Sequence, residues 1–117
     1  MTHLTPLEMI FVKEFCRSVG ISPDTANELD VKDRNPDPVG FMTTLIPSSV
    51  PPELRFASRV FSPLWTAHVG PDRLPCGMVL FFDEVTGRLD AIEGFAYGEE
   101  WPSIEEPVIW SEPNEQQ

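Results

Sequence analysis

Glu93 is the residue of this sequence that most invites a chemical role, because it interrupts the apolar pattern of a predicted β-hairpin. The hairpin lies in the run MVLFFDEVTGRLDAIEGFAYGEEWP, residues 78–102. If the alternation of its return strand is unbroken, Glu93 points toward the core. A buried carboxylate there would need a partner such as Arg55 or Arg59, or it would take up a proton. A perturbed carboxylate in a cleft is a candidate functional group.

A β-bulge gives a second interpretation of the same strand. Gly94 is the kind of residue that marks a bulge. A bulge near Glu93 and Gly94 would reverse the alternation, so that Ile92 faces the core and Glu93 faces solvent. We favour the bulge because one feature then accounts for both Ile92 and Glu93.

Aromatic residues among acids follow the hairpin and form a candidate interface. Such aromatics can cap the core while the acids stay solvated. In the functional interpretation, aromatic side chains ringed by charge form the centre of a binding surface. The interface candidates are Phe95, Tyr97, Glu99, Glu100, Trp101, Glu105, Glu106 and Trp110.

The negative charge is concentrated in the C-terminal third. Residues 83–117 hold ten of the 19 acidic side chains and a single base, Arg88, and so carry −9 of the net charge of −11. Such a field repels nucleic-acid phosphate and anionic lipid, so we expect neither partner. It favours a basic protein partner, although acidity also serves solubility alone.

Motifs for catalysis or cofactor binding are not found in the sequence. The two histidines, His3 and His68, lie far apart, and no Cys/His spacing matches a zinc site. There is no nucleophile elbow and no glycine-rich phosphate loop. We therefore predict no metal, no cofactor and no catalytic residue. Cys16 lies among the apolar residues of a predicted helix, which indicates a reduced, buried thiol.

Local signals predict the elements that must position these side chains. A capping box at Thr5 and a stop at Gly20 predict an N-terminal helix. A short second helix is predicted from Ser22, then a weak edge strand over residues 29–34, a turn or loop over 35–38 and a strand over 40–46. Residues 77–83 and 88–97 form the hairpin, with Gly87 in its turn.

These elements predict one α+β domain. The N-terminal helix packs on a mainly antiparallel β-sheet of about four or five strands. The domain covers residues 1–110, and residues 111–117 form a flexible acidic tail. No apolar run reaches the roughly 20 residues of a membrane span, and no signal peptide is evident, so we expect a cytoplasmic protein.

The segment from Ile92 to Pro102, IEGFAYGEEWP, resembles the ending "LEGYxYxxxWP" of small uncharacterised bacterial proteins. In those proteins, as here, the segment follows a glycine-centred hairpin and an upstream strand like Gly40-Phe41-Met42-Thr43. Phe95 and Ala96 depart from the commoner aromatic residue and threonine. The resemblance implies a small α+β domain and no particular reaction.

The leading functional hypothesis is a non-enzymatic acidic binding protein. It would contact a basic protein, as an immunity or inhibitor protein contacts a basic toxin. The alternative is a small-molecule-binding domain or small enzyme with a pocket near Glu93 and Trp65. A nucleic-acid mimic is a third hypothesis.

Overall fold

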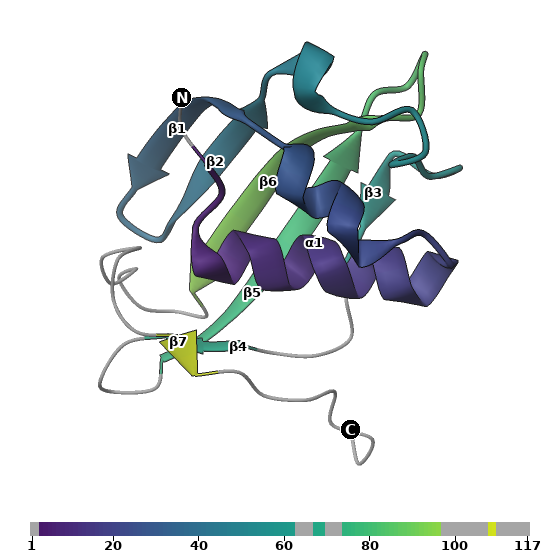
Figure 1. Cartoon of the computed structure of the whole chain (residues 1–117). Helices are drawn as coiled ribbons and strands as arrows, with labels where there is room; N and C mark the ends of the chain where they lie inside the picture. Colours follow the sequence, from purple (N-terminus) through teal and green to yellow (C-terminus); the bar gives the residue numbers. More distant parts are fainter. Residues whose placement is uncertain (1–2, 63–66, 70–73, 97–107, 110–117) are drawn as a thin grey trace.

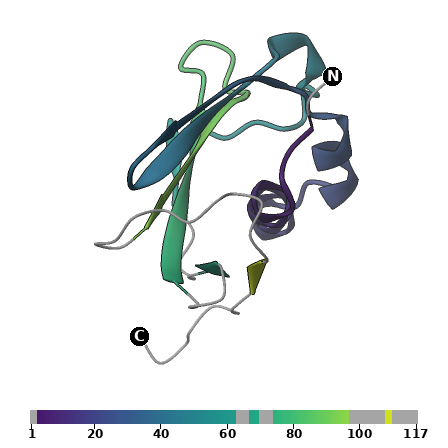
Figure 2. The same ribbon diagram turned by 90° about the vertical axis from the view of Figure 1, so that its left-hand side faces the viewer.

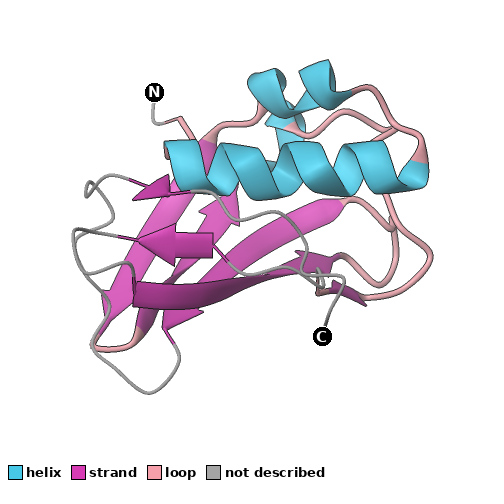
Figure 3. Ribbon diagram, turned by 90° about the horizontal axis from the view of Figure 1, so that it is seen from below, coloured by secondary structure: helices cyan, strands magenta, loops and turns pink. Residues whose placement is uncertain are grey.

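The protein has two layers, with the helices packed against one face of an antiparallel sheet (Figures 2 and 3). The computed structural model describes residues 3–62, 67–69, 74–96 and 108–109. The predicted α+β fold, with an N-terminal helix on a mainly antiparallel sheet, is confirmed. The expected boundary between a domain of residues 1–110 and a tail of residues 111–117 falls outside the described residues.

The long helix, α1 (Pro6–Val19), begins and ends where the sequence predicts. The Thr5 hydroxyl accepts a hydrogen bond from the Glu8 backbone N–H, and the Glu8 carboxylate accepts one from the Thr5 N–H. Gly20 then takes a φ of 80°, a left-handed conformation that glycine adopts without steric penalty. One side of α1 lies along the sheet (Figure 1), and Phe15 on that side is fully buried.

The described strands form one sheet in the spatial order β1-β2-β6-β5-β4-β7, and β3 pairs with β5 beside this path. Each pairing is antiparallel. Among the described residues, five strands have three or more residues, as expected, and β3 and β7 have two each. The strands are β1 (Val31–Asp37), β2 (Gly40–Leu45), β3 (Val60–Phe61), β4 (Ala67–Val69), β5 (Leu74–Phe82), β6 (Leu89–Ala96) and β7 (Val108–Ile109).

Two short 3-10 helices complete the helical side of the molecule. The first, η1 (Pro23–Glu28), is the second helix that the sequence predicts, in a tighter form. The second, η2 (Pro47–Ser49), follows β2 at the prolines that were expected to end that strand. Leu54 lies beyond η2 and is fully buried, so this connection also contributes to the core.

Strand β1 is longer than predicted. The loop prediction for residues 35–38 is wrong for Asn35, Pro36 and Asp37, which continue the strand, and the turn is made by Pro38 and Val39 alone. Because β1 is the outermost strand, proline is tolerated there despite its missing N–H. Proline and charged side chains also protect a sheet edge from pairing with other chains.

The core lies between α1 and the sheet. The Phe15 ring packs on three other rings, those of Phe56, Phe61 and Phe82, with centroid distances of 4.9–5.5 Å. Cys16 is a reduced, buried thiol, as predicted, and the Cys76 side chain is buried as well. Burial raises the pKa of Cys76 to about 12, so this thiol stays protonated at neutral pH.

The hairpin of β5 and β6 is confirmed, including its turn. Gly87 has a φ of 75°, the left-handed conformation expected for it. The Asp83 carboxylate accepts hydrogen bonds from the backbone N–H groups of Val85 and Thr86, both at 2.8 Å. The turn therefore determines the register with which β6 returns along β5.

Candidate interaction surface on the distal face of the sheet

Glu93 faces away from α1, because a bulge reverses the alternation of β6 at Asp90. Phe81 pairs with Ala91 and Phe82 pairs with Leu89, so Asp90 is the extra residue. Leu89 and Ile92, three positions apart, are consequently both buried. The predicted outward direction of Glu93 is confirmed, whereas the predicted position of the bulge, near Glu93 and Gly94, is wrong.

Gly94 has a different role from the one predicted. Its pairing with Phe41 and Met78 is regular, and its φ is not positive. A Cβ atom at Gly94 would lie 2.4 Å from a ring carbon of Phe41. Glycine is therefore needed here because an aromatic ring on β2 lies over the backbone of β6.

The side of the sheet away from α1 is called the distal face here, and it carries Met42, Thr44, Val79, Phe81, Ala91, Glu93 and Phe95. These side chains are all half-buried. Figure 2 shows this side of the central strands turned away from the helices. The face is therefore mainly apolar, and Glu93 is the carboxylate at its centre.

Glu93 lies in the middle of a cross-strand row. Met42 is opposite it on β2, and Val79 is opposite it on β5. Side chains directly opposite one another in a sheet are close neighbours. Among the described residues, none forms an ion pair or a hydrogen bond with the Glu93 carboxylate. A core-facing Glu93 would have needed a partner such as Arg55 or Arg59, so the absence of one among the described residues agrees with the outward direction.

A hollow of about 460 Å³ lies next to this row. Its volume is within the range of roughly 300–1,000 Å³ found for small-molecule sites. Met42 and Ala91 are shared between the hollow and the surroundings of Glu93, while Trp65 of the predicted pocket lies outside the described residues. The hollow is lined by Met42, Arg59, Val60, Phe81, Phe82, Asp90 and Ala91.

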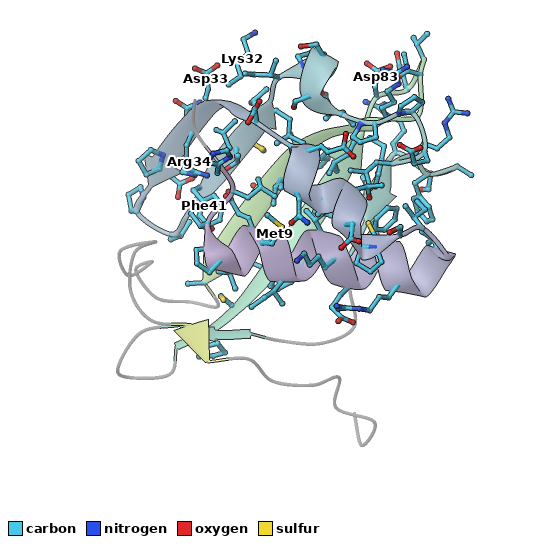
Figure 4. All side chains as sticks on the ribbon, in the orientation of Figure 1. Met9, Lys32, Asp33, Arg34, Phe41 and Asp83 are labelled. Carbon is cyan, nitrogen blue, oxygen red and sulfur yellow. The ribbon has the colours of Figure 1, made fainter. Side chains whose placement is uncertain are left out.

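Acidic side chains surround the distal face. Asp33 pairs with Thr44 and so shares its side of the sheet, and Asp37 lies at the end of the same edge strand. Asp90 is exposed at the bulge. The bases described near these acids are Lys32, next to Asp33 (Figure 4), Arg88, which lines a second hollow together with Asp90, and Arg59, which forms an ion pair with Glu84 at 3.3 Å. Negative charge therefore predominates around the apolar centre.

No protein-family model, curated protein or solved structure matches this chain. The resemblance to small bacterial proteins therefore stays a prediction.

Two of the predicted site residues are described, and the structure brings them together. Glu93 and Phe95 are two positions apart on β6 and lie on the same face. The other interface candidates lie outside the described residues: Tyr97, Glu99, Glu100, Trp101, Glu105, Glu106 and Trp110.

Neither a metal site nor a membrane-spanning helix occurs among the described residues. In this part of the chain, no group of three or more His, Cys, Asp or Glu side chains is arranged to hold a metal ion. The helices in the same part are too short or too polar to cross a bilayer.

A buried polar cluster joins α1 to the sheet, and sequence reasoning missed it. Glu8 is 0% exposed. Its carboxylate accepts hydrogen bonds from the Arg34 guanidinium, at 2.6 Å, and from the Thr43 hydroxyl, besides the bond from the Thr5 N–H. Arg34 and Phe41 lie at the end of the sheet beside the start of α1 (Figure 4).

This cluster positions the helix and offers no free reactive group. Both oxygens of Glu8 are engaged, as a buried carboxylate requires. A sequence signal for it existed in β2, where Thr43 stands between the core residues Phe41 and Leu45 on the same side of the strand. A polar residue in such a row indicates a buried partner.

Proposed function

We propose that this protein is a non-enzymatic binding protein whose distal face contacts a basic protein partner. In acidity and size it suits the class of immunity or inhibitor proteins that bind a basic toxin. The observation that carries the proposal is the half-buried carboxylate of Glu93, which lies at the centre of an apolar sheet face and has no partner among the described residues. An apolar centre with a charged rim is the usual anatomy of a protein–protein interface.

Charge supports the choice of a basic partner. The net charge of −11 attracts cationic proteins and accelerates their encounter at low ionic strength. Asp33, Asp37 and Asp90 around the distal face would act in the same direction.

The test compares association rates. A partner captured at low salt is purified, and its binding is measured with the wild type and with a D33N/D37N/D90N variant. We expect the on-rate of the variant to fall by about tenfold at low salt, with a flatter dependence on ionic strength. A control variant, E14Q/D24N/E28Q, removes the same number of charges from the helical layer and should have a smaller effect. An on-rate that responds to neither salt nor the distal variant would rule the proposal out.

The hollow beside Met42 and Ala91 favours a second candidate function, the binding of a small molecule. Its apolar lining carries Arg59 and Asp90 as charged groups, which suits a small amphipathic ligand. A screen for compounds that raise the melting temperature tests this function. Hits are then compared between the wild type and Ala91→Phe, which fills the hollow. Hits that stabilise both proteins equally would exclude this site.

A further inference from the structure

We propose that Glu93 receives an arginine side chain of the partner, and that a bulky apolar residue next to this arginine enters the neighbouring hollow. The proposal rests on the proposed function and specifies the chemistry of the same surface. Glu93 would make the central contact, whereas the charged rim would only steer the partner toward the face.

Covering the distal face costs free energy, because the Glu93 carboxylate loses its contact with water. Any molecule that docks there removes the remaining water from Glu93, whose cross-strand neighbours Met42 and Val79 are apolar. A carboxylate that loses its water without gaining a partner is strongly destabilising. No described residue of this chain supplies that partner. The docked molecule must therefore bring a cation to Glu93.

Another copy of this chain does not suit the distal face as its occupant. A two-fold dimer would place the distal face against itself. Glu93 would then approach Glu93 across the axis, and two molecules of net charge −11 would meet at their acidic rims. Arg59, the described arginine at the hollow, already pairs with Glu84. The occupant that can neutralise the Glu93 carboxylate is therefore a different chain, one that carries positive charge.

Arginine suits the surroundings of Glu93 better than lysine does. A guanidinium group is weakly hydrated, binds a carboxylate through two parallel hydrogen bonds and tolerates apolar surroundings. Its alkyl stem would lie on Met42 and Val79, which flank the carboxylate on the adjacent strands. The hollow shares Met42 with this row and has Phe81 and Val60 in its lining, so it suits a large apolar side chain.

The experiment uses two short amphipathic peptides that differ in one residue. One has a single arginine between leucines, and the other has citrulline, which is neutral and of the same shape, in its place. Each is titrated into the ¹⁵N-labelled full chain, as wild type, E93Q and E28Q. Glu28 is the matched control, because it is an exposed glutamate of η1, away from the distal face, and has no described ion pair.

We expect the arginine peptide to shift the amide signals of Met42, Val79 and residues 91–95, and to bind the wild type about tenfold more tightly than the citrulline peptide. The E93Q substitution should abolish this preference for arginine, whereas E28Q should retain it. The spectra also report whether each variant is folded.

The proposal is overturned if the wild type binds both peptides equally or not at all, or if E28Q removes the preference as fully as E93Q does. Signal shifts that depend on protein concentration without peptide would indicate a second copy on this face, which also overturns it. The proposed function is tested separately. If the D33N/D37N/D90N variant slows association with the natural partner while Glu93 shows no preference for arginine, charge steering stands and this inference fails.

Discussion

Position 94 requires glycine because the ring of Phe41 lies over it. This contact decides how substitutions at the centre of β6 affect stability. The two residues are directly opposite each other on β2 and β6. Their neighbour Glu93 points the other way, into the distal face, and its carboxylate has no described partner to lose. Adjacent residues of one strand thus have unrelated roles.

Gly94→Ala should therefore destabilise the protein more than Glu93→Gln does. A new Cβ atom 2.4 Å from the Phe41 ring forces that ring to move, at a cost of about 1–3 kcal/mol. Glu93→Gln should change the free energy of unfolding by no more than about 0.5 kcal/mol. Urea unfolding of both variants measures the difference. The reverse order would mean that Glu93 has a buried partner.

Phe41→Leu serves as the control for this contact. In the Gly94→Ala background this substitution should cost less stability than in the wild type, because the smaller leucine side chain relieves the clash with the new Cβ atom. Additive effects would show that the ring does not account for the cost at Gly94.

Glu8 is the second residue whose substitution should have a large effect. Glu8→Gln removes the charge that Arg34 faces, and the side chain of Arg34 is only 18% exposed. Breaking a buried pair from one side costs about 3–5 kcal/mol, and the cost here should lie near the lower figure because Gln keeps the shape and can still accept hydrogen bonds. Thermal and urea unfolding measure the loss.

Glu14→Gln is the matched control, because it breaks the surface pair between Glu14 and Arg17 on the same helix. An exposed pair contributes at most about 1 kcal/mol. Similar losses for the two variants would refute the view that the Glu8 cluster holds α1 on the sheet.

At the scale of elements, β1 and the β5–β6 hairpin determine the shape of the distal face. β1 is an edge strand protected by Pro36, so a partner that adds a strand is less suited to this edge than one that covers the face. The hairpin turn determines the register of β6, and the bulge at Asp90 directs Glu93 outward.

The turn has a pH dependence that can be measured. Hydrogen bonds from the backbone N–H groups of Thr86 and Val85 lower the pKa of Asp83 below its usual value of 3.8. Because the pKa is lower in the folded state, the resulting stabilisation is present above about pH 3.8 and is lost as the pH falls through the folded-state pKa. Asp83→Asn should therefore weaken the dependence of stability on pH in this acidic range. Urea unfolding at several acidic pH values measures this dependence. If the unfolding free energy of Asp83→Asn depends on pH as strongly as that of the wild type, Asp83 is not its source.

At the scale of the whole molecule, the distribution of charge governs association. The C-terminal third carries −9 of the net −11. Much of this negative charge belongs to Glu99, Glu100, Glu105 and Glu106, which lie outside the described residues.

Changing these four glutamates to glutamine should slow association with the natural partner and flatten its salt dependence, while stability changes little. Stopped-flow association at several ionic strengths measures the effect. An E14Q/D24N/E28Q/E53Q variant has the same net charge, keeps the charge of residues 83–117 and should be slowed less. Equal slowing would show that total charge, and not its location, controls the encounter.

The sequence alone determined the ends of α1 and the turn of the hairpin. Each depends on bonds between residues a few positions apart, such as the reciprocal bonds of Thr5 and Glu8 or the left-handed conformation of Gly87. Such local rules also predicted the α+β class, and they predicted the outward direction of Glu93 because Ile92 competes with it for the core.

Only the tertiary structure decided the features that depend on distant partners. The position of the bulge follows from the pairing of Leu89 and Ala91 with β5, and the identity of Gly94 follows from the ring of Phe41 on β2. Glu8 meets Arg34 and Thr43 across 26 and 35 positions of the chain. A capping box looks the same in sequence whether its glutamate is exposed or buried, since burial is decided by what the fold packs over it.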